Sequence, residues 1–223
     1  MNVVLLFPGQ GSQKPGMAKD LVDARPAARE TFATVDAALG ESLSTLCFDG
    51  PGETLTLTHN AQPALLAHGA AVWATVRDRV GPHVRAAAGH SLGEFTAYHA
   101  AGAFDVAHGT RLVRRRGELM FESGEQRPGT MAAILGDVAG GIDALCAKVS
   151  ADGGCVVPAN YNTPGQVVIS GEVPAVERAM ELFRPEQEGL LLVVYFRRPA
   201  PSERQHVDQL GRGWRRLRSD SRK

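Results

Sequence analysis

The sequence is poor in cysteine, and the cysteines that it has are not paired. Cys47, Cys146 and Cys155 are the only 3 cysteines among 223 residues, and none of them forms a Cys-x-x-Cys spacing. This distribution argues against a disulfide framework and against a zinc site, and it is typical of proteins in a reducing cytoplasm. We therefore expect a cytoplasmic location and no metal in the functional site.

Net charge and long apolar runs are also absent. The 24 basic and 24 acidic side chains cancel, so we expect no broad electrostatic attraction to nucleic acid or to an anionic membrane. No run approaches the ~20 apolar residues of a membrane-spanning helix. The short apolar run 1–7 has no basic start and leads directly into Pro8-Gly9. It therefore predicts a buried first strand and not a signal peptide.

What the sequence does contain is the pentapeptide Gly89-His90-Ser91-Leu92-Gly93. Gly-x-Ser-x-Gly is the pattern of a nucleophile elbow, in which a serine stands on a sharp turn between a strand and a helix. The two glycines remove side chains that would collide where the strand and the helix close up. The turn also directs backbone N–H groups at the place where an oxyanion would form. Ser91 is therefore the candidate nucleophile.

The residues around the elbow indicate an α/β protein. A strand of small residues is expected at Val84–Ala88, before Ser91, and a helix from Leu92 to about Ala101. The clearest amphipathic helix is Gln62–Val80, which Gly81-Pro82 ends. The remaining elements expected in this half are a strand at 3–7 and helices at 18–22, 27–38 and 105–122.

The pattern changes after about residue 127. Strands are predicted at 131–135, 156–157 and 166–170, and helices at 142–150 and 174–183. This β-α-β-β-α order fits a small α+β subdomain inserted into a larger α/β unit. We assign residues 1–127 to the larger subdomain, 128–183 to the smaller one and 184–223 to a tail.

The elbow is one of several motifs that follow one another in a fixed order. The others are Phe7-Pro8-Gly9-Gln10-Gly11-Ser12-Gln13, Gln62-Pro63-Ala64-Leu65, Arg116-Gly117 and the stretch 160–171. This ordered set resembles the malonyl-CoA:acyl-carrier-protein transacylases of fatty acid synthesis and the related acyltransferase domains of polyketide synthases. The similarity covers roughly residues 1–183.

The resemblance implies a role for each matched residue. Ser91 would form an acyl-serine ester, and the backbone N–H groups of Gln10 and Leu92 would form the oxyanion hole. Arg116 would hold the free carboxylate of the malonyl group with its guanidinium fork. The family positions that line the cleft between the subdomains are matched by Gln62, Asn160 and Gln166.

The resemblance also implies a fold and a reaction. The fold would be α/β, with a truncated parallel sheet of the serine-hydrolase kind and an inserted ferredoxin-like subdomain. The reaction would be malonyl transfer from malonyl-CoA to the phosphopantetheine thiol of acyl carrier protein. Coenzyme A enters only as the thioester substrate, so no further cofactor is implied, and the expected partners include neither nucleic acid nor a membrane.

Other interpretations of the same residues stay open at this stage. Ser91 could be an ordinary helix N-cap, Gln62 could cap a helix, and Arg116 could belong to a solvated run with Arg114 and Arg115. His90 is expected to be structural, because a residue beside an elbow serine points away from it. For the whole chain, the alternatives are an α/β-hydrolase-type esterase or thioesterase and a non-catalytic remnant that binds carrier protein.

The family's general base is a histidine in a Gly-x-x-His-Ser segment, and the tail contains no such segment. His206 is the only histidine there, and its neighbours do not match, so the base stays unassigned. Apart from an apolar run at 190–196 that fits one strand, the tail is rich in arginine, with 9 arginines and 1 lysine against 5 carboxylates. We expect it to be poorly ordered. A shifted reading frame near Arg184 would explain the change, and activity would be impaired.

Overall fold

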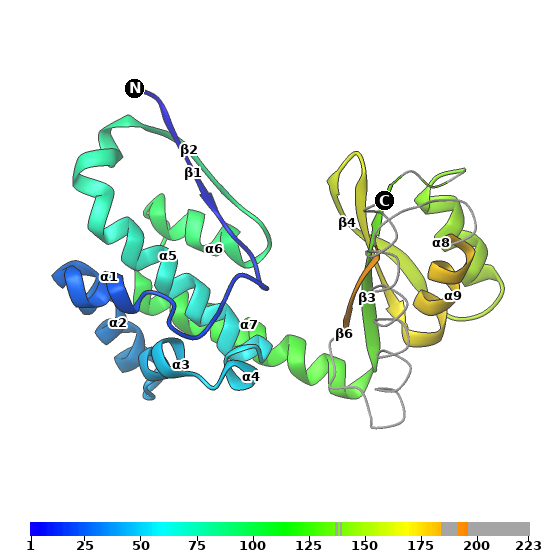
Figure 1. The fold of residues 1–223 in the computed structure, drawn as a ribbon, viewed down its shortest axis with the longest axis horizontal. Coiled ribbons are helices and arrows are strands. Elements are labelled where there is room, and N and C mark those ends of the chain that lie inside the picture. Colours follow the sequence, from blue (N-terminus) through cyan, green and yellow to red (C-terminus); the bar gives the residue numbers. More distant parts are fainter. Residues whose placement is uncertain (137, 139, 184–190, 196–223) are drawn as a thin grey trace, which may run out of the picture. The chain divides into compact units, whose positions relative to one another are not determined.

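The computed structural model describes residues 1–136, 138, 140–183 and 191–195, and it shows an α/β protein with two compact units (Figure 1). The first unit comprises Met1–Glu122, and the second begins at Ser123. The division falls within helix α7 (Val106–Gln126), which therefore contributes residues to both units. Within the described part of the chain, no helix is long and apolar enough to cross a membrane.

The first unit contains a parallel pair of strands, β1 (Val3–Phe7) and β2 (Val84–Gly89). Their register places Leu5 opposite Ala87 and Phe7 opposite Gly89, so both strands end at the same edge. Helix α6 (Leu92–Ala100) follows β2 and packs against both strands. The predicted strand–turn–helix around Ser91 is therefore confirmed.

Helix α5 (Thr58–Val80) is central to the core of the first unit. Its Ala64, Leu66 and Ala71 are fully buried, and they belong to one cluster with Phe32 and Val35. The latter two come from α2 (Pro26–Leu39), which packs along α5 and follows the short helix α1 (Lys19–Ala24).

The prediction that this central helix begins at Gln62 was wrong by about one turn. Proline is favoured in the first turn of a helix, but Pro63 lies inside α5. In the structure an earlier turn precedes it, since the Leu57 carbonyl accepts from the N–H groups of Asn60 and Ala61, each at 2.8 Å. The Asn60 side chain also donates to the Thr54 carbonyl at 2.9 Å.

Two short helices, α3 (Leu43–Asp49) and α4 (Gly52–Leu55), were not predicted. Both lie between Gly40 and α5, where the sequence analysis expected no helix. They bury Leu43, Cys47 and Leu55 against the core, and none of these side chains is more than 1% exposed. Tertiary burial therefore stabilises helices that are too short to show a periodic pattern.

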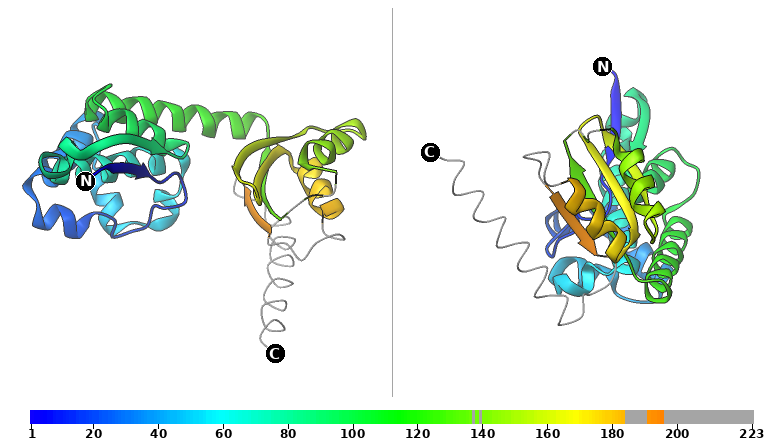
Figure 2. Two further views of the ribbon diagram at one scale, coloured as in Figure 1. Left: turned by 90° about the horizontal axis from the view of Figure 1, so that it is seen from above. Right: turned by 90° about the vertical axis from the view of Figure 1, so that its right-hand side faces the viewer.

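The second unit contains a four-stranded antiparallel sheet with two helices on one face (Figures 1 and 2). Its elements follow the order β3 (Gly129–Leu135), α8 (Ile142–Ala151), β4 (Val156–Thr163), β5 (Gln166–Glu172), α9 (Val173–Phe183) and β6 (Leu191–Tyr195). The strands lie side by side in the order β4-β5-β3-β6. The core beneath α8 and α9 includes Ile134, Val149, Ile169 and Val176.

Two features of this unit differ from the sequence analysis or extend it. The strand predicted at 156–157 is longer in the structure, since Asn160 and the residues to Thr163 belong to β4, and only Pro164-Gly165 form the turn. Cross-strand pairing with β5 explains the difference, because it continues as far as the pair Thr163 and Gln166. The apolar run in the tail forms β6, which pairs with β3. The other residues of 184–223, including His206, lie outside the described residues.

Candidate active site

Ser91 lies on the sharp turn between β2 and α6. Its backbone has φ 53° and ψ −103°, a conformation with positive φ that non-glycine residues rarely adopt. Ser91 stands at the N-cap position of α6, but its side chain makes no capping hydrogen bond. The hydroxyl therefore does not cap the helix, and the interpretation of Ser91 as an ordinary N-cap is not supported.

The glycines of the pentapeptide are required by close backbone contacts. A Cβ on Gly89 would collide with the backbone of Gly93, and a Cβ on Gly93 would collide with the carbonyl of Phe7 at the end of β1. Gly9 follows β1, and a Cβ there would lie 2.6 Å from the carbonyl oxygen of His90. The elbow and the loop after β1 are thus packed backbone against backbone, which fixes the position of Ser91.

Arg116 reaches the hydroxyl of Ser91 from α7. Its Nη2 donates to the Ser91 Oγ at 3.1 Å, and its Nη1 donates to the Gln62 Oε1 at 2.6 Å. The guanidinium carbon lies 5.4 Å from the centre of the Phe95 ring. A hydroxyl, an amide oxygen and an aromatic face therefore hold one cation beside the candidate nucleophile.

The three consecutive arginines of α7 have different surroundings, because successive helical residues point about 100° apart. Arg115 is exposed and pairs with Glu118 and Glu122. Arg114 is mostly buried and bonds to Asn60 and Glu41. Arg116 alone points to Ser91, so the interpretation of the run as one solvated face is wrong.

Gln62 is completely buried in α5 and orients Arg116. While its Oε1 accepts from Arg116, its Nε2 donates to the sulfur of Met120 at 3.3 Å. It therefore does not serve as a helix cap. Met120 and Phe95 are contacts that the sequence analysis missed, although Met120 follows Arg116 by four residues and Phe95 follows Ser91 by four, the spacing of neighbours on one helix face.

The two residues expected to form the oxyanion hole lie on either side of the elbow. Leu92 is the first residue of α6, so its N–H belongs to the group that has no acceptor within the helix. Gln10 lies in the loop after β1, and its side-chain Nε2 donates to the Thr58 Oγ1 at 3.3 Å. That contact ties the loop to the start of α5, and the oxyanion role of both N–H groups stays a prediction.

Asn160 and Gln166 belong to the second unit, and their part in the site stays a prediction. Asn160 lies in β4 opposite Val168, and Gln166 begins β5. The Gln166 Oε1 accepts a hydrogen bond from the Asn162 Nδ2 at 3.0 Å. The residues that the structure does bring together are Ser91, Arg116 and Gln62.

His90 packs against the loop after β1 beside Ser91. A Cβ on Gly9 would lie 2.9 Å from its ring Nδ1, and its backbone N–H donates to the Phe7 carbonyl at 3.2 Å. Among the residues that the structure describes, no group of three or more histidine, cysteine, aspartate or glutamate side chains is arranged to hold a metal ion.

The sequence matches the acyl transferase domain family over residues 4–195. It is 47% identical over 180 residues to the malonyl CoA-acyl carrier protein transacylase of Bacillus subtilis, an alignment that covers 81% of this chain and 56% of the relative. The chain thus spans little more than half the length of this curated relative.

Solved structures show the same similarity. The acyl-carrier-protein S-malonyltransferase of Bartonella henselae superimposes with a TM-score of 0.79 at 42% identity, covering 86% of this chain and 62% of the other. A malonyl-transacylase solved in complex with a type II polyketide synthase acyl-carrier protein gives a TM-score of 0.78 at 42% identity, covering 87% and 63%.

Proposed function

From the premise that the chain belongs to the malonyl-CoA–acyl carrier protein transacylase family, we propose that it transfers malonyl groups through Ser91. The donor is malonyl-CoA, and the acceptor is the phosphopantetheine thiol of acyl carrier protein. The observation that carries this proposal is the contact of Arg116 with the hydroxyl of an elbow serine. A nucleophile and a carboxylate-binding cation thus lie within one hydrogen bond of each other.

In the proposed reaction the Ser91 oxygen attacks the thioester carbonyl carbon of malonyl-CoA. The carbon–sulfur bond breaks, coenzyme A leaves as its thiol, and the malonyl group remains as an ester on Ser91. The thiol of the carrier protein then attacks this ester, and the serine hydroxyl is restored. The N–H groups of Leu92 and Gln10 stabilise the oxyanion of both tetrahedral intermediates.

Arg116 binds the free carboxylate of the malonyl group. A carboxylate is a stronger acceptor for a guanidinium than a hydroxyl is, because the hydrogen bond joins opposite charges. Gln62 holds the Nη1 side of the guanidinium, and the Phe95 ring lies beside the cation. The substrate carboxylate therefore takes over the Nη2 donor and releases the Ser91 oxygen. Asn160 and Gln166 are proposed to line the substrate cleft from the smaller subdomain.

The finer fold assignment follows the same premise. We assign β1 and β2 to a parallel sheet of the serine-hydrolase kind, with α6 packed against it. This sheet belongs to a larger subdomain, residues 1–127. The smaller subdomain, residues 128–183, is proposed to be ferredoxin-like. The β-α-β-β-α-β order and the strand order β4-β5-β3-β6 support this assignment.

The proton of Ser91 must be taken by a base during attack. None of the 7 histidines in the 223 residues lies in a Gly-x-x-His-Ser segment. Loss of the base from a serine nucleophile lowers the rate by orders of magnitude, although an oxyanion hole and substrate binding retain part of the catalysis. We therefore propose that the 223-residue chain forms the malonyl-serine ester slowly.

Incubation of the 223-residue chain with malonyl-CoA, followed by intact mass spectrometry, tests the proposal. We expect slow addition of one malonyl group, which Ser91→Ala abolishes and Ser42→Ala retains, since Ser42 is exposed and makes no capping bond. Subsequent addition of the thiol form of acyl carrier protein should remove the label. Hydrolysis of neutral esters without malonyl labelling would favour the esterase alternative, and carrier-protein binding without labelling would favour a non-catalytic role.

A further inference from the structure

Helices α5 and α7 are joined by two hydrogen bonds of the same kind. The Arg116 Nη1 donates to the Gln62 Oε1 at 2.6 Å, and the Arg114 Nη1 donates to the Asn60 Oδ1 at 2.9 Å. In both bonds an arginine of α7 donates to a side-chain amide oxygen of α5. The pair Arg116 and Gln62 lies two residues further along both helices than the pair Arg114 and Asn60. Two residues correspond to about 200° of rotation around a helix. The two bonds therefore hold different sides of α7.

The backbones of the two helices touch at Gly117. A Cβ at this position would lie 2.6 Å from the His59 Cα and 2.8 Å from the Thr58 carbonyl oxygen. Glycine allows this approach, but it provides no side chain that could interlock with α5. Resistance to rotation of α7 about its own axis must therefore come from the side chains around this crossing.

Arg114 makes contacts that oppose such a rotation. Its side chain is only 15% exposed, and its Nη2 forms an ion pair with Glu41, in the turn that follows α2. The acceptor Asn60 is itself fixed, because its Nδ2 donates to the Thr54 carbonyl at 2.9 Å. One mostly buried guanidinium thus connects α7 to α5 and to the turn after α2, and Asn60 links this contact to α4.

We propose that Arg114 is a positioning residue, which fixes the rotation of α7 on α5 and thereby keeps Arg116 on Gln62 and Ser91. The functional importance of this arrangement rests on the malonyl transfer proposed above. Arg114 touches neither Ser91 nor Gln62 in the bonds described, and it acts through the helix that carries both arginines. Truncation of Arg114 would leave Glu41 and Asn60 without their donor and would allow α7 to rotate at Gly117.

A thiol placed at position 91 reports on Arg116 without requiring malonyl-CoA. The probe is Ser91→Cys in a Cys155→Ser background, because Cys155 is exposed. Burial raises the pKa of Cys47 to about 12 and that of Cys146 to about 11, so neither competes at neutral pH. A nearby guanidinium lowers a thiol pKa, and one pKa unit changes the thiolate fraction about ten-fold near neutral pH. Iodoacetamide alkylation, followed by intact mass as a function of pH, gives this pKa.

Four further substitutions in the probe background make the experiment specific. Arg116→Met should raise the thiol pKa and slow alkylation about ten-fold at pH 7. Arg114→Met should give the same direction of change by several-fold, and Arg114→Lys should give an intermediate value, since lysine keeps a charge but not the fork. Arg115→Met is the matched control, because it removes only exposed ion pairs on the same helix. It should leave the pH profile unchanged.

A thiol pKa in Arg114→Met equal to that of Arg115→Met would overturn the positioning role, whatever the change in thermal stability. If Arg114→Met does not fold, Asn60→Ala decides by the same pH profile, since it keeps Arg114 and removes its acceptor on α5, together with the bond from Asn60 to the Thr54 carbonyl. Malonyl labelling of the unsubstituted chain is measured separately. If the unsubstituted chain is not labelled but Arg114→Met shifts the thiol pH profile, the proposed function is refuted and the positioning role stands. If the chain is labelled but Arg114→Met leaves the profile unchanged, the positioning role is refuted and the proposed function stands.

Discussion

The Ser91 hydroxyl is held by a cation, the guanidinium of Arg116. Arg116 donates to its oxygen at 3.1 Å, and this bond occupies a lone pair that nucleophilic attack would use. A substrate with a free carboxylate competes for the guanidinium, whereas a substrate with a neutral acyl group does not. For the proposed malonyl transfer, we therefore expect the same contact to favour malonyl over acetyl substrates in two ways, through binding and through release of the nucleophile.

This reasoning gives a prediction for Arg116→Met. Labelling of Ser91 by malonyl-CoA should fall about 10- to 100-fold, the value of one or two charge-assisted hydrogen bonds. Labelling by acetyl-CoA should stay equal or rise, because the Ser91 oxygen has lost its donor. Time courses by intact mass with both thioesters measure the ratio. An equal fall with both substrates would mean that Arg116 acts on Ser91 alone and not on the carboxylate.

Single residues of the site could be predicted from the sequence only where a motif singled them out. Ser91, Arg116 and Gln62 came from the motif set, and the structure brings all three together. Phe95, Met120 and Arg114 belong to no motif, since their importance comes from the angle at which α7 crosses α5. That angle depends on Gly117 and on contacts between residues more than fifty positions apart, which a local pattern does not contain.

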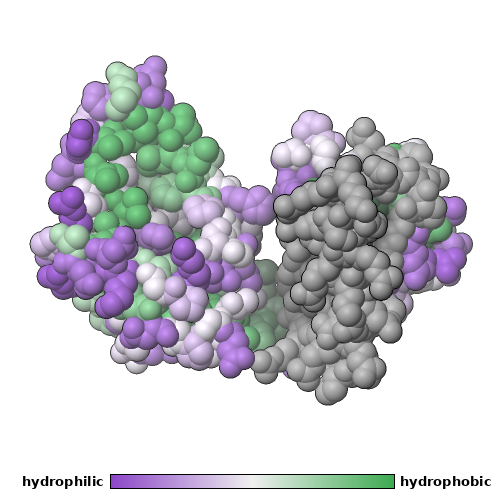
Figure 3. Space-filling model, viewed as in Figure 1, coloured by the Kyte–Doolittle hydropathy of each residue, from purple (hydrophilic) through white to green (hydrophobic). Residues whose placement is uncertain are grey.

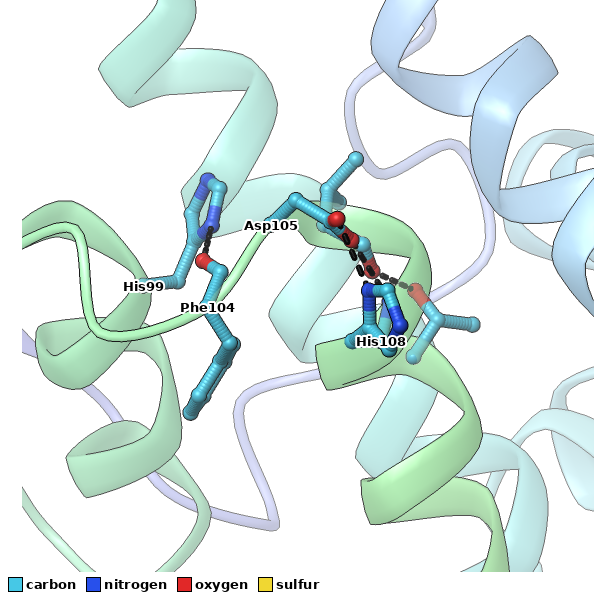
Figure 4. Close-up of polar contacts among 6 residues, drawn as sticks. His99, Phe104, Asp105 and His108 are labelled. Atoms are coloured by element: carbon cyan, nitrogen blue, oxygen red, sulfur yellow. Dashed lines mark hydrogen bonds and ion pairs between the residues drawn. The ribbon is translucent and has the colours of Figure 1, made fainter.

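At the scale of elements, helix α7 carries both arginines, and its start is fixed by Asp105 (Figure 4). The Asp105 Oδ1 accepts from the backbone N–H of His108 at 2.8 Å, and its Oδ2 lies 2.8 Å from the His108 Nδ1. An aspartate just before a helix is a preferred N-cap, because it satisfies N–H groups that have no acceptor in the first turn. The sequence prediction had placed Asp105 at the start of this helix.

The cap should make stability depend on pH. Hydrogen bonds from the backbone and the side chain of His108 hold the pKa of Asp105 below its ordinary value of 3.8. A depressed folded-state pKa contributes stability that is present above the unfolded value and is lost as pH falls through the folded one. Asp105→Ala should therefore lower the thermal midpoint at pH 6, and the difference from the unsubstituted chain should shrink below about pH 4. Thermal unfolding by circular dichroism between pH 3 and pH 6 measures this, with the exposed Asp23→Ala as control; a difference independent of pH would contradict it.

The elements that could be predicted are those with a long periodic pattern or a strong stop signal. Helices α2, α6, α8 and α9 and strands β1, β2, β3 and β5 lie within two residues of their expected ends. The start of α5, the extent of β4 and the helices α3 and α4 were missed. In each case contacts outside the element's own pattern extend or stabilise it: bonds to Leu57 and Thr54 at the start of α5, burial in α3 and α4, and pairing with β5 along β4.

At the scale of the whole molecule, the described residues of the first unit cover the parallel pair on one face only. Its other face presents Val4 and Leu6, which are 57% and 76% exposed, and the paired Ala86 and Ala88 are exposed beside them. Figure 3 shows apolar surface over β1 and β2. Parallel sheets are normally covered on both faces, and a bare apolar face of this kind favours association.

We therefore expect the chain to self-associate through this face. Sedimentation velocity should show an average mass that rises with protein concentration, and the double variant Val4→Glu/Leu6→Lys should remain monomeric. Both side chains are mostly exposed, so their replacement removes little from the core. Leu112→Lys is the control, because Leu112 is an exposed apolar residue of α7 outside this face. Among the residues that the structure describes, no other strand pairs with the outer edges of β1 and β2. Association through such an edge would use backbone groups that these substitutions leave in place. If the double variant associates as strongly as the unsubstituted chain, association through the apolar face is rejected. The contact is then assigned to the strand edges.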